Sequence, residues 1–221
     1  MTVLPENRTV ADFQARARRA LATEPPRAMC DVAGHAGPSD FELNPGLDGS
    51  GLLGAQRRPK PAAVLVPIRE TRGRASVLLT QRAATMRVHA GQIAFPGGRA
   101  DRADDGPAAT ALREAQEEIG LRPDQVDILG FLDGYLTGTG YMVSPVVGLV
   151  GPDFVARPEP GEVAEVFDVP LDFLMDPANH QTHRRKIDGR AYSFVAMSFG
   201  NRYIWGATAG MLKNLYERVY G

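Results

Sequence analysis

The chain has 221 residues, of which 43% are hydrophobic and 23% are charged, as in ordinary globular proteins. Its formal net charge of −1 excludes a global positive field for nucleic acid but not a basic pocket for a small anion. The single cysteine, Cys30, excludes an intramolecular disulfide and fits a reducing compartment. Apolar runs are too short to cross a bilayer and no secretory signal pattern is present, so we expect a cytoplasmic protein without membrane or nucleic-acid partners.

Residues 1–60 differ in composition from the rest of the chain. Thr9 can cap a short helix that runs to Leu21, because the apolar side chains between them form one modest stripe. Residues 23–61 are rich in Pro, Gly, Ser and Asp, which predicts an irregular arm that wraps the domain or a partner subunit. We therefore divide the chain into an N-terminal helix with an arm, residues 1–60, and a folded domain, residues 61–221.

From residue 62 onward the apolar pattern predicts several strands and two further helices. A Thr71-Arg72-Gly73-Arg74 turn joins the first two strands into a hairpin. The strands outnumber the helices, which predicts a mixed α/β architecture with one sheet system and about three helices. The expected strands are residues 62–68, 75–81, 126–136, 144–150, 162–169 and 190–198, and the expected helices are residues 107–119 and 206–220.

Three carboxylates share one face of the helix expected at residues 107–119. At roughly 100° per residue, Glu117 and Glu118 lie on either side of Glu114, within roughly 60° of it. These like charges repel one another, whereas a divalent cation such as Mg²⁺ would be bound by oxygen ligands of this kind. Taken alone, a solvated acidic face is the commoner explanation of such a helix.

A glycine pair before this helix favours a ligand site over a solvated face. Phe95-Pro96-Gly97-Gly98 follows a short apolar segment, and adjacent glycines let the backbone approach a ligand closely. Pro107 sits at the opening of the helix, where its missing N–H costs nothing. A glycine loop followed by convergent acids predicts a site for phosphate and metal.

Residues 98–121 resemble the box of the Nudix hydrolase superfamily, G-x5-E-x7-R-E-U-x-E-E-x-G-U, where U is aliphatic. The helical half matches in Arg113-Glu114-Ala115-Gln116-Glu117-Glu118-Ile119-Gly120-Leu121, with Ala at the first aliphatic position. In the loop half, Asp104 replaces the expected Glu, and eight rather than seven residues separate it from the Arg. Asp105 restores that spacing but lies one residue too far from Gly98. The identity of a loop carboxylate ligand therefore stays open.

The resemblance implies a fold in which a mixed β-sheet is sandwiched between helices, with the box as loop–helix–loop. It implies Glu114 and Glu118 as the principal Mg²⁺ ligands, with Mn²⁺ as a possible replacement. Glu117 would be a further ligand or would activate water, and Arg113 would orient a glutamate through a charge-assisted hydrogen bond. The superfamily and the arm together lead us to expect a homodimer.

Residues 78–98 are similar to the signature of the coenzyme A pyrophosphatase branch, L-L-T-x-R-[SA]-x3-R-x3-G-x3-F-P-G-G, at every fixed position. This similarity implies hydrolysis of the pyrophosphate of coenzyme A to adenosine 3′,5′-bisphosphate and 4′-phosphopantetheine. Arg82, Arg87 and His89 could supply the extra cation that the 3′-phosphate needs, and Gly97 and Gly98 could approach the phosphates. The alternative is that both arginines are surface charges paired with nearby Asp residues.

Three downstream residues have two possible roles each. Glu162 could reach the metal site and position the attacking water, or it could be a charge at a strand edge. Tyr203 and Trp205 could stack on adenine, although in an apolar C-terminal segment such residues belong more often to the core.

Other functions compatible with the sequence are a Nudix pyrophosphatase for ADP-ribose or NADH, and a non-catalytic Nudix domain that senses a ligand. Such sensing domains commonly lose an acid of the R-E-x-x-E-E core, and here all three acids are present. A third possibility is a scaffold protein whose arm binds a partner.

Overall fold

The computed structural model describes residues 8–25, 35, 37–44, 58–86, 89–187 and 190–221. The helices are α1 (Val10–Ala20), α3 (Gly106–Ile119), the short α4 (Leu171–Leu174) and α5 (Ala207–Val219). The strands are β1 (Lys60–Thr71), β2 (Arg74–Arg82), β3 (Ile93–Ala94), β4 (Gly97–Arg99), β5 (Val126–Phe131), β6 (Tyr135–Leu136), β7 (Tyr141–Val150), β8 (Val163–Pro170), β9 (Gln181–Ile187), β10 (Arg190–Phe199) and β11 (Arg202–Trp205).

The main sheet has eight strands and is mixed, as expected. β1 and β7 run parallel at its centre, and the other pairings in this sheet are antiparallel. β2 pairs with β1, β3 and β8, while β4 pairs with the first half of β1. The pairing of β4 with β1 is what places Gly97 and Gly98 beside Val64 and Ala63.

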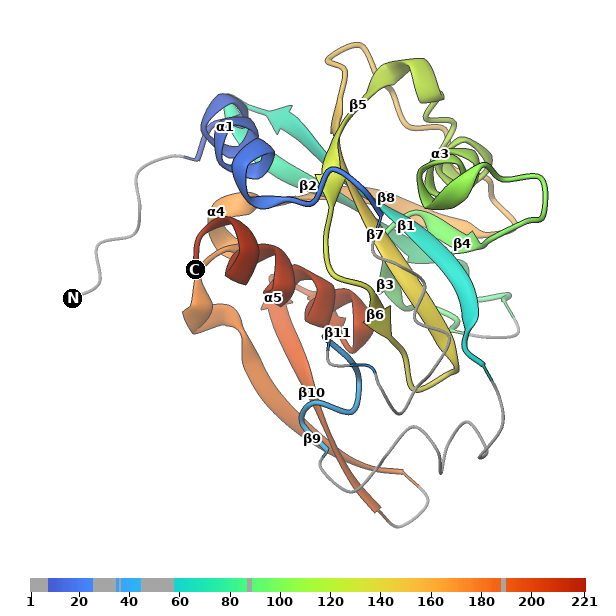
Figure 1. Cartoon of the computed structure of the whole chain (residues 1–221). Coiled ribbons are helices and arrows are strands. Elements are labelled where there is room, and N and C mark those ends of the chain that lie inside the picture. The colour runs from blue at the N-terminus through green and yellow to red at the C-terminus, as the bar shows by residue number, and fades with distance from the viewer. Residues whose placement is uncertain (1–7, 26–34, 36, 45–57, 87–88, 188–189) are drawn as a thin grey trace.

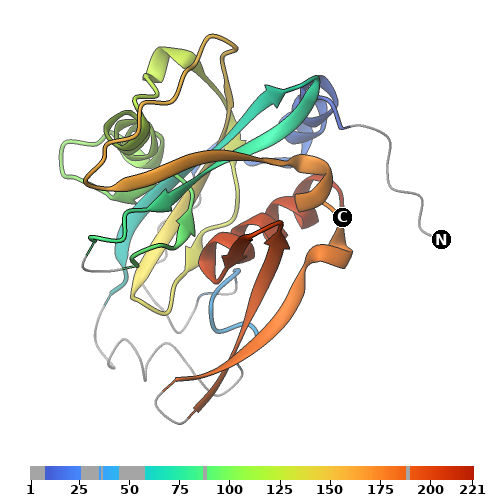
Figure 2. The same cartoon turned by 180° about the vertical axis from the view of Figure 1, so that it is seen from behind.

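Helices cover both faces of this sheet (Figures 1 and 2). β1 has apolar side chains on both faces of the sheet, because successive side chains of a strand point to opposite faces. Ala63 and Leu65 join the core under α3, whereas Val66 and Ile68 join the larger core formed with α1 and α5. The expected sheet sandwiched between helices is therefore confirmed.

Several local predictions are also confirmed. Thr9 caps α1, where its side chain accepts a hydrogen bond from the backbone N–H of Asp12 at 3.2 Å. The β1–β2 hairpin turns through Arg72 and Gly73, whose φ angles of 54° and 75° suit a primed two-residue turn. The helix expected to end at residue 119 does end there, and Gly120 follows it in the left-handed conformation with φ of 71°.

The expectation of a single sheet system is wrong, because β9, β10 and β11 form a separate antiparallel sheet. β9 has the sequence Gln-Thr-His-Arg-Arg-Lys-Ile, which shows no apolar alternation, and β11 has four residues. β9 and β10 project from the body of the molecule in Figures 1 and 2. The strand expected at residues 126–136 is also interrupted, since residues 132–134 separate β5 from β6.

A described piece of the arm, residues 37–44, joins the two sheets. Asp40 accepts hydrogen bonds from the Tyr135 hydroxyl at 2.9 Å and from the Gly138 N–H at 2.7 Å. The buried Asn44 side chain donates to the Ser193 carbonyl at 2.8 Å and accepts from the Ser193 N–H at 2.7 Å. Cys30 lies outside the described residues. No helix among the described residues is long and apolar enough to span a membrane.

Asn44→Ala tests this connection. The substitution leaves the Ser193 N–H and carbonyl of β10 without their partner, and we expect the free energy of unfolding to fall by about 2–3 kcal/mol. Chemical denaturation of both proteins measures the change. Glu42→Ala is the matched control, because Glu42 is an exposed side chain of the same segment and should cost less than about 0.5 kcal/mol. Equal stability of Asn44→Ala and wild type would contradict the assignment.

Candidate active site

The three acids of α3 differ in depth. Side-chain exposure is 59% for Glu117, 17% for Glu114 and 4% for Glu118. The opposite face of the helix packs on the sheet through Ala115 and Ile119, both of which are fully buried. Glu117 is therefore exposed to solvent, whereas Glu114 and Glu118 lie progressively deeper, toward β1 and β4.

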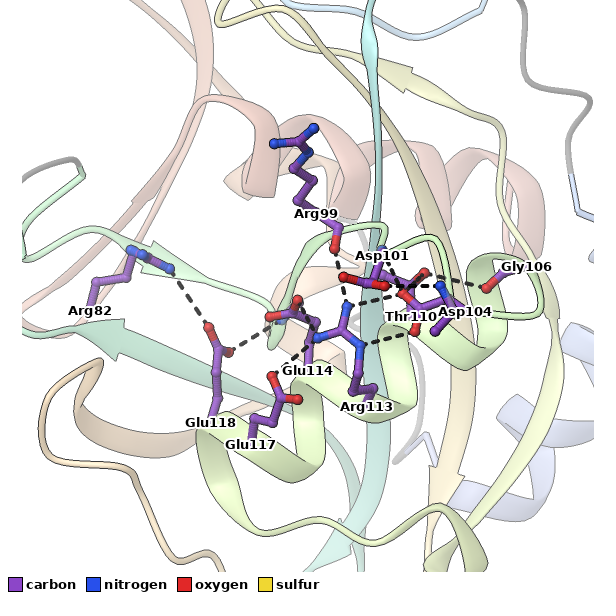
Figure 3. A network of polar contacts seen from close by, with 12 residues as sticks. Arg82, Arg99, Asp101, Asp104, Gly106, Thr110, Arg113, Glu114, Glu117 and Glu118 are labelled. Atoms are coloured by element: carbon purple, nitrogen blue, oxygen red, sulfur yellow. Dashed lines mark hydrogen bonds and ion pairs between the residues drawn. The ribbon is translucent and has the colours of Figure 1, made fainter.

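Arg113 holds two of these acids and the preceding loop together (Figure 3). Its Nε and Nη2 donate to the two oxygens of Asp104, each at 3.0 Å. Its Nη1 donates to Glu114 Oε1 at 2.8 Å and to Glu117 Oε2 at 3.1 Å, and its Nη2 also donates to the Arg99 carbonyl at 3.1 Å. One guanidinium thus fixes the orientation of three carboxylates.

Asp104 acts in this structure as an anchor for the loop. Beyond Arg113, it accepts hydrogen bonds from the Thr110 hydroxyl and from the Asp101 N–H, both at 2.8 Å. The Arg113 guanidinium holds the pKa of Asp104 well below its ordinary value, and Asp104 in turn raises the pKa of Arg113. Both oxygens of Asp104 are therefore engaged by the loop and by Arg113. The one-residue shift of Asp104 in the box leaves the three acids of α3 in place.

Glu118 lies between the glycine loop and β2. Its Oε2 accepts a hydrogen bond from the Gly97 N–H at 3.2 Å, and its Oε1 lies 3.7 Å from Arg82 Nη1. Burial raises the pKa of Glu118 to about 7, although Gly97 and Arg82 oppose that rise, while Glu114 and Glu162 add to it. The buried negative charge is therefore only partly compensated.

Glu162 lies close enough to the acids of α3 to affect them electrostatically. Its carbonyl accepts a hydrogen bond from the Ala83 N–H at 2.8 Å, so the loop before β8 runs beside the end of β2. Burial raises the pKa of Glu114, Arg113 opposes the rise, and the charges of Glu117 and Glu162 add to it. The structure thus brings Glu114, Glu117, Glu118 and Glu162 into one electrostatic cluster.

This cluster fits a hard divalent cation by its chemistry. Carboxylate oxygens are the ligands that Mg²⁺ prefers, and the charges of Glu114 and Glu118 lack full compensation. In the part of the chain that the structure describes, no three acidic, histidine or cysteine side chains already converge closely enough to hold a metal. Glu114 is turned toward Arg113 and Glu118 toward Gly97, so their own protein partners set their present conformations.

The two glycines of the loop are needed for different reasons. A Cβ on Gly97 would lie 2.5 Å from the Ala63 carbonyl oxygen and 2.6 Å from Val64 Cα, so the backbone of β1 excludes it. A Cβ on Gly98 would instead lie 2.4 Å from Glu114 Oε2. Gly97 is therefore required by the sheet, and Gly98 leaves room for a carboxylate of the cluster.

Of the three side chains expected to bind substrate, the structure describes two, and they lie in different surroundings. Arg82 lies at the cluster, and its buried Nε has no hydrogen-bond partner among the described residues. His89 is exposed, and its Nδ1 makes a 2.8 Å hydrogen bond with Gln92 Oε1, so no contact joins it to the acids. Arg87 lies outside the described residues.

Sequence reasoning missed the contacts that tie the loop to the helix. The Thr110 hydroxyl, the Asp101 N–H and the Arg99 carbonyl all join the network of Asp104 and Arg113. The shifted position of Asp104 was the only signal in the sequence, because hydrogen bonds from backbone groups leave no mark on residue identity.

Glu118→Gln tests the burial of this charge in metal-free protein. The ionised form of Glu118 is disfavoured in the folded state, so the carboxyl progressively subtracts stability as the pH rises from 4.5 to about 7. We expect Glu118→Gln to be more stable than wild type by about 2–3 kcal/mol at a pH well above 7. The gain should shrink as the pH is lowered toward 4.5. Denaturant unfolding in a chelator measures it, and a gain independent of pH would contradict the prediction.

Gly98→Ala and Gly97→Ala form a matched pair. Gly98 does not have φ in the left-handed region, and the atoms nearest to an added Cβ all belong to the Glu114 carboxylate rather than to the backbone, so we expect near-normal thermal stability. Displacement of that carboxylate should lower kcat/KM at least about tenfold, equivalent to roughly 1.4 kcal/mol. Gly97→Ala should lower the melting temperature instead, because it meets backbone atoms. The opposite pattern in melting and kinetic measurements would refute the distinction.

Comparisons with known proteins agree with this geometry. The profile of the NUDIX domain family matches residues 59–188. The uncharacterized Nudix hydrolase NudL of Cronobacter sakazakii is 42% identical over 163 residues, which cover 72% of this chain and 83% of that protein. NudL of Escherichia coli K12 is 42% identical over 162 residues, with the same shares of the two chains.

Two solved structures are similar to parts of this chain. A MutT/nudix family protein from Enterococcus faecalis has a TM-score of 0.49 and 18% identity, covering 74% of this chain and 63% of its own. The Nudix hydrolase RenU from M. smegmatis has a TM-score of 0.42 and 27% identity, covering 52% and 72%. Because the family profile covers more than half of the sequence and the curated relatives span most of their own length, this chain belongs to the Nudix family and is a Nudix hydrolase.

Proposed function

We propose that this Nudix hydrolase cleaves the pyrophosphate bond of coenzyme A, giving adenosine 3′,5′-bisphosphate and 4′-phosphopantetheine. Residues 78–98 carry the substrate signature, and Arg82 is the arginine of that signature whose position is described. The observation that carries the proposal is that Arg82 reaches the acids of α3, 3.7 Å from Glu118, with a buried and unpartnered Nε. A guanidinium in this position can donate to a phosphate that enters the cluster.

Nudix hydrolases generally use a divalent metal ion. We assign Glu114 and Glu118 as its principal ligands and Glu117 as a further ligand, with Mg²⁺ or Mn²⁺ as the ion. The bound ion would polarise the phosphoryl oxygens and neutralise the negative charge that develops on them. The partial compensation of the buried Glu118 and the half-buried Glu114 carboxylates supports this assignment.

The chain's own residues would perform the remaining tasks. Arg113 holds Glu114 and Glu117 side by side through its Nη1, and Glu114 would turn from Arg113 to bind the ion. Glu117 or Glu162 would accept the proton of the attacking water, since Glu117 and Glu162 are the exposed acids of the cluster. The Gly98 backbone, which carries no side chain, would allow the pyrophosphate to approach.

The proposal extends to the segment before the glycine loop and to the assembly, location and organisation of the chain. Arg87 and His89 are proposed to contact the substrate from the segment before the glycine loop. A homodimer and a cytoplasmic location also stay predictions. The division into an N-terminal arm, residues 1–60, and a domain, residues 61–221, is likewise proposed.

A substrate panel tests the proposed reaction. The protein is incubated with coenzyme A, ADP-ribose or NADH in Mg²⁺, and kcat/KM is compared. We expect coenzyme A to be preferred by at least about tenfold. Of the three substrates, only coenzyme A has a 3′-phosphate that Arg82, Arg87 and His89 could bind. Preference for ADP-ribose or NADH would contradict the proposed substrate but not the proposed hydrolysis of a pyrophosphate bond.

Glu114→Gln and Glu118→Gln are the variants that separate this proposal from a ligand-sensing domain. Each should lower kcat on the preferred substrate by at least about a hundredfold while the fold is retained, because the metal loses an anionic ligand. Activity at the wild-type level in both variants would exclude the metal assignment. Absence of turnover in the wild-type protein on all three substrates would favour the sensing role.

A further inference from the structure

The separate sheet of β9, β10 and β11 carries a row of aromatic rings on one face. Directly opposed residues of antiparallel strands point to the same face. Register therefore places His183 beside Phe194, Arg185 beside Tyr192 and Trp205 beside Ala196 on this face. We call it the aromatic face, and its rings are those of His183, Tyr192, Phe194, Tyr203 and Trp205.

The rings of the aromatic face are held by contacts among themselves. The His183 and Tyr203 rings stack with centroids 5.7 Å apart and planes 27° apart, and His183 Nδ1 makes a 2.7 Å hydrogen bond with the Tyr203 hydroxyl. The Phe194 and Trp205 rings lie 5.3 Å apart. The small Ala196 on the central strand lets the outer rings meet across it. The face is thus fixed before any ligand binds.

The opposite face of the sheet belongs to the core. Met197 and Ile204 point away from the aromatic face and are buried in the larger core. Tyr203, by contrast, is 40% exposed and is one of two large apolar side chains that stay exposed among the described residues. Part of the Tyr203 ring therefore stays accessible to a ligand.

A groove of about 710 Å³ runs over this face. Its volume falls within the range of about 300–1,000 Å³ that is usual for sites of small molecules. Arg184 and Arg185 line it from β9, and no acidic side chain lines it in the described part of the chain. Its lining residues are Thr182, His183, Arg184, Arg185, Phe194, Tyr203 and Trp205. The groove combines flat aromatic rings with cations.

We propose that this groove is a nucleotide-binding site, in which the base stacks on Tyr203 and Trp205 and a phosphate binds Arg185, which the register places on the same face as the rings. Aromatic rings take bases in a stacked arrangement, and arginine forks bind phosphate oxygens. A single nucleotide fits the groove better than a nucleic-acid strand, because the chain as a whole carries a net charge of −1.

The site goes beyond the proposed reaction and does not depend on it. β10 and β11 lie outside the residues matched by the family profile, which end at residue 188. None of the residues assigned to metal or phosphate at α3 lines the groove. Binding at the aromatic face can therefore be tested without turnover.

Trp205 is the only tryptophan of the chain and lines the groove, so the tryptophan fluorescence of the protein comes from this site. The full chain is titrated in a chelator with adenosine 3′,5′-bisphosphate, which has no anhydride bond to hydrolyse. We expect a saturable change in fluorescence. Tyr203→Ala and Arg185→Glu should each raise Kd at least about tenfold, through loss of stacking and of phosphate attraction respectively. Adenosine without phosphate should bind more weakly than the bisphosphate.

Matched controls make the result specific. Tyr203→Phe keeps the ring and should keep the affinity, and Lys186→Glu reverses a charge on the other face of the same strand and should weaken binding less than Arg185→Glu. Glu114→Gln should leave the titration unchanged. The proposal is overturned if fluorescence does not saturate, if both groove variants bind like wild type, or if Glu114→Gln abolishes the response. A dimer in which Trp205 no longer responds would also overturn it, since a second copy would then cover the groove.

Discussion

The candidate site depends on how one guanidinium, that of Arg113, distributes its donors. Carboxylates in the C-terminal half of a helix are disfavoured by the helix dipole, and neighbouring carboxylates repel one another. Arg113 offsets both effects for Glu114 and Glu117, while its other edge holds Asp104 of the preceding loop. The conformation of the loop and the orientation of the acids are thus coupled. A change that frees Asp104 would also release the acids.

Glu118 is held differently, and the contrast explains why the acids of α3 are not equivalent. Among the described hydrogen bonds and ion pairs, none joins it to Arg113, and its partners are one backbone N–H and a cation 3.7 Å away. The N–H belongs to Gly97, which β1 positions through its pairing with β4. The main sheet thus sets the surroundings of the most buried acid, while the loop sets those of the two outer acids. A cation that binds both groups would connect the sheet to the loop.

What the sequence could predict was local. The cap at Thr9, the hairpin at Gly73 and the common face of the box acids depend on neighbours within a few residues, and each follows from residue type. The second sheet was missed because β9 is an exposed strand whose apolar alternation is absent. Two other contacts depend on the tertiary structure, which no local pattern encodes. Asn44 binds Ser193, 149 residues away, and Arg82 lies beside Glu118.

The box and the rest of the chain have separable tasks. Carboxylates arranged for a cation and a phosphate recognise features that every nucleoside diphosphate derivative shares, so they cannot discriminate among such substrates. Discrimination has to come from groups that reach the non-reacting parts of a ligand. In this chain Arg82, at the end of β2, and His89 are the described residues proposed to contact the substrate from outside the box helix. Selectivity can therefore change while the acids and Arg113 stay as they are.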